Sequence, residues 1–336
     1  MGPQKRSPMK ESEIRPAELF NRYLALARED CEKLLAKAAD FIDVACPACA
    51  DTHSSPAFCK LGFNYVLCEV CQTLYVSPRP SPRLSQEFYS AGKSVAFWST
   101  HFYKETYAAR KEKMFKPRAA LVRELVGKYS AERVAILDVG AGYGMFLEEI
   151  QKLNVFDELI AIEPNTSLAA ICEDKGFHVI PSRVEDVPSG RVRASFASAF
   201  EIVEHVFSPV EFLQAVHKLL EPGGLLILTT LTVSGFDIQV LWEKSKSVYP
   251  PHHLNLMSVT GIERLIERSG FHAVEISTPG LLDVDIVRNA LKEDPDIAVP
   301  RFVSQLLNGD DRMRNSFQEF LKTNRLSSHI QVVARA

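Results

Sequence analysis

The sequence lacks a hydrophobic run long enough to cross a membrane. No apolar stretch in its 336 residues approaches the roughly 20 residues that span a bilayer. The first 16 residues are polar, are broken by Pro3, Pro8 and Pro16, and lack the apolar region of a signal peptide. We therefore expect a cytoplasmic protein that has no membrane partner.

The chain also has little net charge, no internal repeat and no low-complexity tract. Its formal net charge of −3 gives no general attraction to nucleic acid or to anionic lipid. With 46% hydrophobic and 24% charged residues it can build a large core, and its length allows two domains or one domain with additions. Nothing in the sequence sets an oligomeric state.

The seven cysteines argue against a disulfide framework, because the number is odd and five of them lie between Cys46 and Cys71. Four form two Cys-x-x-Cys pairs separated by eighteen residues, namely Cys46, Cys49, Cys68 and Cys71. This is the spacing of a four-cysteine zinc ribbon. Four thiolates leave no open coordination position, which favours structural Zn²⁺, although redox pairs or unbound thiols have the same signature.

Composition and hydrophobic spacing divide the chain into four parts. We expect an N-terminal helical segment over 1–45, the zinc ribbon over 46–82, and a helical, aromatic linker or cap over 83–130. The remainder, 131–336, alternates short β-branched or apolar runs with helical stretches, and 281–328 reads as a helical insertion.

This alternation predicts an α/β fold around a largely parallel sheet. The expected strands are 133–139, 158–163, 177–181, 194–200, 224–231, 272–278 and 329–335. The expected helices are 144–153, 166–175, 208–220 and 259–269, preceded by a helix over 17–41.

A glycine-rich turn follows the first of these strands. Gly140, Gly142 and Gly144 permit a tight turn and a close approach of ligand to backbone, and the next helix offers free N–H groups. Nineteen residues after Gly144, the second strand ends in Glu163, whose carboxylate can accept hydrogen bonds from a ribose. A dinucleotide fingerprint would have its third glycine at Met145, so the turn alone leaves the nucleoside ligand open.

Three further motifs indicate which nucleoside ligand the glycine turn binds. The run "FEIVEHV" ends the fourth strand, "LLEPGG" precedes the fifth, and "PPHHLNLMS" follows it. With the glycine turn, they resemble the class I S-adenosylmethionine-dependent methyltransferases over about residues 133–280 and the last strand, most closely the ubiquinone-type O-methyltransferases. The resemblance implies a Rossmann-like seven-stranded sheet whose final strand is antiparallel. The fourth strand departs from the family pattern where it begins, at Arg193–Phe196.

The resemblance also implies roles. Asp138 and the glycine backbone would hold the methionine portion of S-adenosylmethionine, Glu163 the ribose, Glu185 or Asp186 the adenine, and Glu201 would lie by the methionine end. The predicted cofactor residues are Asp138, Gly140, Ala141, Gly142, Tyr143, Gly144, Glu163, Pro164, Glu185, Asp186 and Glu201.

Three histidines follow the fourth and fifth strands, at the sheet edge where such folds bind ligands. His205, His252 and His253 are the candidate bases if the acceptor is a hydroxyl or an acidic C–H. The ribbon, the aromatic helices and the methyltransferase core together resemble sugar C-methyltransferases, in which a Glu-His pair stands where His252 and His253 stand here. His205 can instead pack beneath the cofactor.

The favoured function is methyl transfer to a small molecule, such as a nucleotide-linked sugar, a glycan precursor or a secondary metabolite. An RNA or other macromolecular methyltransferase that docks through the ribbon is the alternative, and a non-catalytic binding protein is the third possibility. Between Cys46 and Cys71 the only Lys or Arg is Lys60, so nucleic acid is the less favoured partner. The eight basic residues within 104–128 are a solvated helix face or an anion site.

Overall fold

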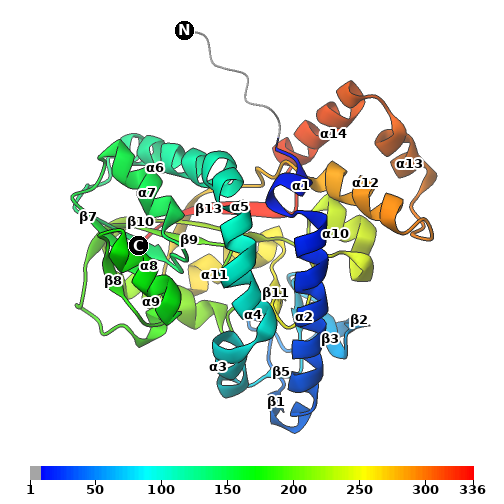
Figure 1. The fold of residues 1–336 in the computed structure, drawn as a ribbon, viewed down its shortest axis with the longest axis horizontal. Helices are drawn as coiled ribbons and strands as arrows, with labels where there is room; N and C mark the ends of the chain where they lie inside the picture. Colours follow the sequence, from blue (N-terminus) through cyan, green and yellow to red (C-terminus); the bar gives the residue numbers. More distant parts are fainter. Residues whose placement is uncertain (1–8) are drawn as a thin grey trace.

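A seven-stranded sheet organises most of the chain, of which the structure, a computed structural model, describes residues 9–336 (Figure 1). Its strands are β6 (Ala135–Val139), β7 (Glu158–Ile162), β8 (His178–Ile180), β9 (Ala194–Phe200), β10 (Leu220–Leu231), β12 (His272–Ser277) and β13 (His329–Arg335). They lie in the order β12-β13-β10-β9-β6-β7-β8. Strand β13 runs antiparallel to both neighbours, and β6 to β10 are mutually parallel where they pair. The predicted α/β sheet with an antiparallel last strand is confirmed.

Helices cover both faces of this sheet. The helices that follow strands are α7 (Met145–Leu153), α8 (Thr166–Asp174), α9 (Pro209–Leu219) and α11 (Val259–Arg268). One core joins α9 and α11 to strand residues such as Leu137 and Leu226, and a second joins α7 to the neighbouring residues Ile136 and Leu225. Adjacent strand residues thus enter opposite cores, as expected where both faces are buried.

The cysteine pairs flank the strands of a second, smaller sheet, and Cys68 ends one of these strands. This sheet contains β2 (Ser54–Lys60), β3 (Phe63–Cys68), β4 (Leu74–Val76) and β11 (Asn255–Leu256), in the order β11-β4-β3-β2. A two-stranded ladder of β1 (Phe41–Ile42) and β5 (Arg79–Pro80) adjoins it in the chain. Strand β11 comes from the loop after β10 and pairs antiparallel with β4, so residues far apart in sequence complete one sheet.

The N-terminal helices lie side by side with the aromatic segment. Helices α1 (Glu11–Ile14) and α2 (Ala17–Leu35) are followed, after the ribbon, by α3 (Pro82–Ala91), α4 (Lys93–Phe97), α5 (Tyr103–Arg110) and α6 (Lys116–Lys128). Helix α2 packs along α4 (Figure 1). Two π-helical turns, Trp98–Phe102 and Lys111–Phe115, separate α4, α5 and α6.

The helix expected over 17–41 is shorter than its sequence pattern. It ends at Leu35, and a 3₁₀ turn at Ala38–Asp40 leads into β1. Phe41 and Ile42 are drawn into extended backbone by pairing with Pro80 and Arg79, which a helical window cannot reveal. The part of the 1–45 segment before residue 9 lies outside the described residues.

The stretch from 281 to 328 contains three helices that project beside the sheet (Figure 1). They are α12 (Asp283–Glu293), α13 (Arg301–Asn308) and α14 (Asp311–Thr323), and they share a small core with α10 (Phe236–Leu241). Short 3₁₀ turns occur at Val184–Asp186 and Trp242–Lys244. Within residues 9–336, no helix combines the length and apolar character that a membrane span requires.

Two buried carboxyl groups lie where this helical stretch joins the sheet. Asp283 accepts hydrogen bonds from Ser327 Oγ at 2.6 Å, Gln318 Nε2 at 2.7 Å and the Ser328 amide at 2.7 Å. The neighbouring Asp237 is fully buried, and within residues 9–336 neither of its carboxyl oxygens has a hydrogen-bond partner. Burial, and then the charge of Asp283, raise the pKa of Asp237 to about 8.

Replacing Asp237 with asparagine is expected to change how stability depends on pH. The folded-state pKa of Asp237 is raised, so its contribution to stability is complete below pH 4 and is lost as pH rises towards 8. Between pH 4 and 8, the free energy of unfolding of D237N should therefore rise relative to that of the unaltered protein by about 1 kcal/mol for each pH unit. Urea unfolding between pH 5 and 8 measures this, with Asp285→Asn, which removes a partly exposed carboxylate of the same helical stretch, as the control. Parallel curves for D237N and the unaltered protein would contradict it.

Candidate functional site

The glycine turn connects β6 to α7 with three residues in the left-handed region. Gly140, Gly142 and Gly144 have φ of 73°, 55° and 66°. A Cβ on Gly140 would stand 2.3 Å from Ile202 Cδ1, so a side chain there meets both strain and a clash. The amide of Gly140 donates to the Ile162 carbonyl at 2.7 Å, which ties the turn to the end of β7. Glycine at these positions thus lets the backbone turn tightly at the carboxyl ends of β6 and β7.

Glu163 lies at the end of β7 against this turn. Its Oε2 accepts the Gly142 amide at 2.8 Å and its Oε1 accepts the Asn165 amide at 2.9 Å. The side chain is nearly buried, and burial raises the pKa of Glu163. Each carboxylate oxygen retains a further lone pair, so Glu163 can orient the loop and still accept ligand hydroxyls. The adjoining Pro164 is exposed.

Asp138, Ala141 and Tyr143 complete the immediate surroundings of the turn. Asp138 is buried and accepts Ser198 Oγ at 2.8 Å, and burial raises the pKa of Asp138 to about 7. Ala141 is also buried. The Tyr143 hydroxyl donates to the Ser99 carbonyl and so links the turn to the helices before the sheet.

Glu185 and Asp186 lie away from this buried cluster. Both are exposed on the 3₁₀ turn after β8. Asp186 forms an ion pair with Arg183 at 2.8 Å, whose guanidinium lowers the pKa of Asp186. Glu185 is the more accessible of the two carboxylates for a hydrogen bond to a base edge.

Glu201 adopts a strained backbone conformation at the end of β9, with φ of 56°. Three groups meet at its Oε1: Arg118 Nη2 at 2.6 Å, Thr229 Oγ1 at 2.7 Å and His329 Nε2 at 2.8 Å. Burial acts against ionisation, but His329 and Arg118 hold the pKa of Glu201 well below its usual range. Glu201 is therefore an oriented, ionised carboxylate beside the glycine turn.

Sequence reasoning did not assign a role to Arg118, Thr229 or His329 individually. Arg118 lies in the basic stretch noted above, and its guanidinium also stacks over Phe200 at 4.5 Å. Thr229 is on β10 and His329 begins β13, far from Glu201 in the chain. No local pattern connects these residues; the strand order alone brings them together.

His205 and His253 face each other at the edge of the sheet, with ring centroids 4.9 Å apart. His205 Nδ1 is 2.9 Å from the His252 carbonyl, and His253 Nδ1 is 2.6 Å from the Ser247 carbonyl. A carbonyl only accepts, so each Nδ1 carries the hydrogen and each Nε2 is an acceptor in the neutral ring. Burial lowers the pKa of His205 to about 4 and of His253 to about 3, so both rings are neutral at pH 7.

His252 has different surroundings from the other two histidines. Its Nε2 is 2.8 Å from Ser94 Oγ, which in turn donates to Asp30. Its ring packs against Tyr23 and Phe88 at centroid distances of 5.1 and 4.9 Å. Burial lowers the pKa of His252 well below its usual range. The structure thus brings His205 and His253 together and points His252 towards α2 and α4.

Glu204 is a further acidic group beside the paired histidines. One carboxylate oxygen of Glu204 and one ring nitrogen each of His205 and His253 lie within 4.8 Å of one another. Burial, and then the charge of Glu201, raise the pKa of Glu204 to about 8. These three donors can share a proton or hold a divalent cation. Glu204 was not among the predicted site residues, although it lies within the "FEIVEHV" run, and this run is the sequence signal that could have identified it.

An aromatic lid, which we define as Phe97, Trp98, Phe102, Tyr103 and Tyr107, lies on α4, on α5 and on the π-helical turn between them. Tyr103 OH lies 4.0 Å from the position a Gly142 Cβ would take, and its ring meets Tyr143 at 5.4 Å. Trp98 meets Tyr23 of α2 at 4.8 Å, and Tyr23 in turn meets His252. The lid therefore runs from the glycine turn to Tyr23, and Tyr23 connects it to His252.

The four predicted metal-binding cysteines form a cluster. The Sγ atoms of Cys46 and Cys71 are 3.5 Å apart, as are those of Cys49 and Cys68, and all four lie within 4.8 Å of one another. Tetrahedral Zn²⁺ with bonds of about 2.3 Å places its sulfurs about 3.8 Å apart, so the cluster fits that ion. Cys59 is exposed outside the cluster, while Cys31 and Cys172 are buried elsewhere.

The seven-stranded order, the glycine turn and the carboxylate ending the next strand together define a nucleoside-binding methyltransferase fold. A model of the methyltransferase domain family matches residues 103–276. The chain belongs to this family and is an S-adenosylmethionine-dependent methyltransferase, so that prediction and the enzyme prediction are confirmed.

Curated relatives share part of this region. The ubiquinone biosynthesis O-methyltransferase of Ruegeria pomeroyi is 27% identical over 180 residues, 45% of this chain and 71% of the relative. The tRNA U34 carboxymethyltransferase of Idiomarina loihiensis is 26% identical over 162 residues, and the match spans about half of that protein, 49%. The plantazolicin methyltransferase BpumL in complex with SAH aligns over 75% of this chain and 93% of its own, with TM-score 0.49 and 14% identity.

Proposed function

We propose that this methyltransferase acts on a small molecule held between the aromatic lid and the paired histidines. The observation that carries the proposal is the restricted solvent access of the site, because Glu201, His205 and His253 are each only partly exposed. A nucleotide-linked sugar, a glycan precursor or a secondary metabolite is compatible with such a site. The ubiquinone-type relative, by its name, belongs to small-molecule biosynthesis.

The basic residues of 104–128 support a small acceptor over RNA. Five of them form ion pairs with acidic residues of the same chain: Lys111, Lys113, Lys116, Arg118 and Lys128. Arg110 is buried against three aromatic rings. In the ribbon, Lys60 donates to the Ser245 carbonyl at 2.7 Å. Phosphate recognition requires cations that face solvent. Arg110, Lys111, Lys113 and Arg118 are largely screened, which leaves four exposed cations in this stretch: Lys104, Lys116, Arg123 and Lys128.

For the cofactor, we assign the methionine portion to Asp138, the glycine turn and the Glu201–Arg118 pair. Arg118 can meet the methionine carboxylate, and Glu201 lies where the amino group or sulfonium would be stabilised by negative charge. Glu163 would accept the ribose hydroxyls. Glu185 is better placed than Asp186 to reach the adenine amino group, because Asp186 is paired with Arg183.

The transfer itself needs a nucleophile in line with the sulfonium methyl. A bond forms between the acceptor atom and the methyl carbon while the carbon–sulfur bond breaks, releasing S-adenosylhomocysteine. A proton from the acceptor passes to Nε2 of His253 or His205, both of which are free of protons at neutral pH. Glu201 is the ionised carboxylate whose charge raises the pKa of both rings, so it can stabilise the resulting imidazolium, and His252 holds the segment through Ser94. The four cysteines would hold structural Zn²⁺.

The test is transfer of a labelled methyl group from S-adenosylmethionine into cell extract, followed by ultrafiltration and nuclease treatment. Label in the small-molecule filtrate is the expected result, and H253A should reduce it at least about tenfold. Label held on nuclease-sensitive polymer would favour the second candidate, an RNA methyltransferase, which the tRNA-modifying relatives support. An unchanged rate for the combined H205A and H253A variant would remove the base assignment.

A further inference from the structure

The segment that carries the histidines is held along one side by the ribbon sheet. Tyr65 on β3 donates its hydroxyl to the His253 carbonyl at 2.8 Å, and the Val76 amide donates to the Leu254 carbonyl at 3.0 Å. The next two residues, Asn255–Leu256, form β11 and pair with β4. Three successive parts of the chain after His252 are thus bound to the ribbon through their backbones.

Arg79, at the end of the ribbon, connects this segment to the loop that carries His205. The side chain is fully buried, and its Nη1 donates to Asn255 Oδ1 at 2.8 Å and to the Phe207 carbonyl at 3.0 Å. Asn255 then donates to the Val203 and Val206 carbonyls at 3.2 and 2.8 Å. One guanidinium and one amide therefore set the spacing between the loop after β9 and the loop after β10.

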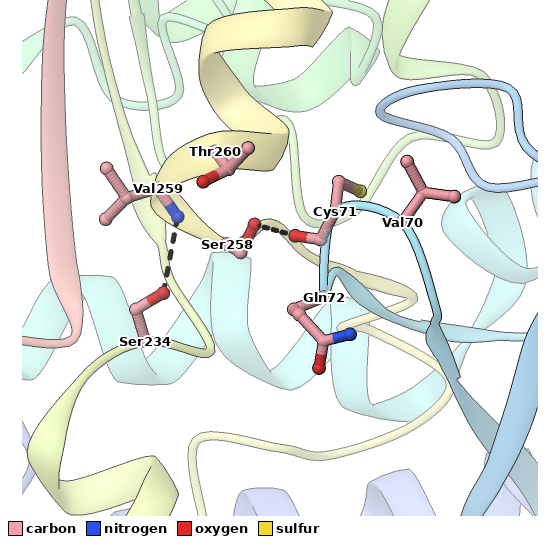
Figure 2. Close-up of a pocket in the computed structure, with 7 residues that line it drawn as sticks. All are labelled: Val70, Cys71, Gln72, Ser234, Ser258, Val259 and Thr260. Carbon is pink, nitrogen blue, oxygen red and sulfur yellow. Dashed lines mark hydrogen bonds between the residues drawn. The ribbon is translucent and has the colours of Figure 1, made fainter.

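The two Cys-x-x-Cys turns, which we call the knuckles, contact the chain that follows β11. Ser258 caps α11 and donates its hydroxyl to the Cys71 carbonyl (Figure 2). Val259 is held in turn by Ser234 from the loop after β10 (Figure 2). From the first knuckle, the Ala48 carbonyl accepts Arg268 Nη1 at 2.7 Å. Both knuckles thus contact α11, so the position of the four thiolates is transmitted to the start and the end of that helix.

We propose that the ribbon is a positioning module for methyl transfer, in which Tyr65 and Arg79 hold the backbone of 252–255 so that the rings of His205 and His253 face each other. This inference rests on the proposed function, because it takes these two rings as the groups that serve the acceptor. The sheet of the ribbon contacts 253–256, and both knuckles contact α11 or its N-cap, Ser258. Tyr65 and Arg79 are positioning residues that act through backbone carbonyls and amides.

The test is Tyr65→Phe, which removes one hydroxyl and keeps the ring packed against Phe58. We expect S-adenosylmethionine affinity and zinc content to stay within twofold of the unaltered protein. Hydrogen–deuterium exchange should accelerate for amides of 252–257, and turnover in the extract assay should fall about tenfold, the effect of losing one positioning hydrogen bond. The ¹⁵N signal of the His253 ring should shift, which a loss of general stability would not produce.

Tyr75→Phe is the matched control, since Tyr75 is equally buried in the same sheet and its hydroxyl interacts with Ser54. It should change neither the exchange of 252–257 nor turnover. Unchanged exchange and an unchanged His253 signal in Tyr65→Phe would overturn the inference, as would faster exchange with full turnover. If the unaltered enzyme labels no small molecule, the proposed acceptor class fails, and the exchange and ring signals then decide the positioning role by themselves.

Discussion

Replacing Glu163 with glutamine is expected to weaken S-adenosylmethionine binding at least about 100-fold. The variant loses the ionised acceptor for the ribose hydroxyls, and hydrogen bonds to charged groups contribute about 1.5–3 kcal/mol each. It also places an amide that donates hydrogen bonds beside the Gly142 or Asn165 amide, both of which now donate to the carboxylate. Isothermal titration with S-adenosylmethionine measures the dissociation constant directly and needs no acceptor.

The matched control for this experiment is Glu173→Gln. Glu173 is exposed on α8, in the same strand–helix unit, and its charge is lost in the same way. Both variants should show the circular dichroism of the unaltered protein, and Glu173→Gln should bind the cofactor normally. A normal dissociation constant for Glu163→Gln would mean that another group holds the ribose.

Replacing Cys71 with serine is expected to abolish metal binding and to lower stability by about 5 kcal/mol or more. Structural zinc contributes folding free energy directly, with apparent values of about 10–16 kcal/mol in small zinc domains. The unaltered protein should contain about one zinc ion per chain, closed by four thiolates. Metal analysis together with urea unfolding, with and without a chelator, measures both quantities.

Cys59→Ser provides the control, because Cys59 is exposed and lies outside the cluster although it falls between the two pairs in sequence. It should retain the metal and its stability. The structural metal would be excluded if the purified protein contained no zinc and unfolded at the same urea concentration with and without chelator. A redox role for the two Cys-x-x-Cys pairs would then be favoured.

Sequence periodicity located the strands and helices of the sheet because each forms from contiguous residues, so its hydrophobic pattern is complete within a short window. The predicted strand 194–200 and helix 166–175 match β9 and α8 to within one residue. The glycine turn and the cysteine pairs could also be identified from the sequence, because their chemistry depends on short fixed spacings. In the structure, the four cysteines of the two Cys-x-x-Cys motifs form one cluster, as the sequence predicted.

The features that sequence reasoning missed depend on contacts between distant residues. Strand β11 has two residues and exists because β4 offers it an edge, so no window around Asn255 can predict it. The contact between His329 and Glu201 requires β13 to insert beside β10, and neither residue carries a local sign of the other. Buried Asp237 likewise acquires its neighbour Asp283 from a separate helix.

The insertion of β11 into the smaller sheet also limits how this enzyme can be recombined. A fragment ending near residue 82 would expose the open edge of β4 and leave the Arg79 guanidinium without its Asn255 partner. Exchanging the ribbon between related enzymes should therefore succeed only when 252–268 travels with it. Two stretches separated by about 170 residues of chain then behave as one inheritable unit, and compensating substitutions are expected between them.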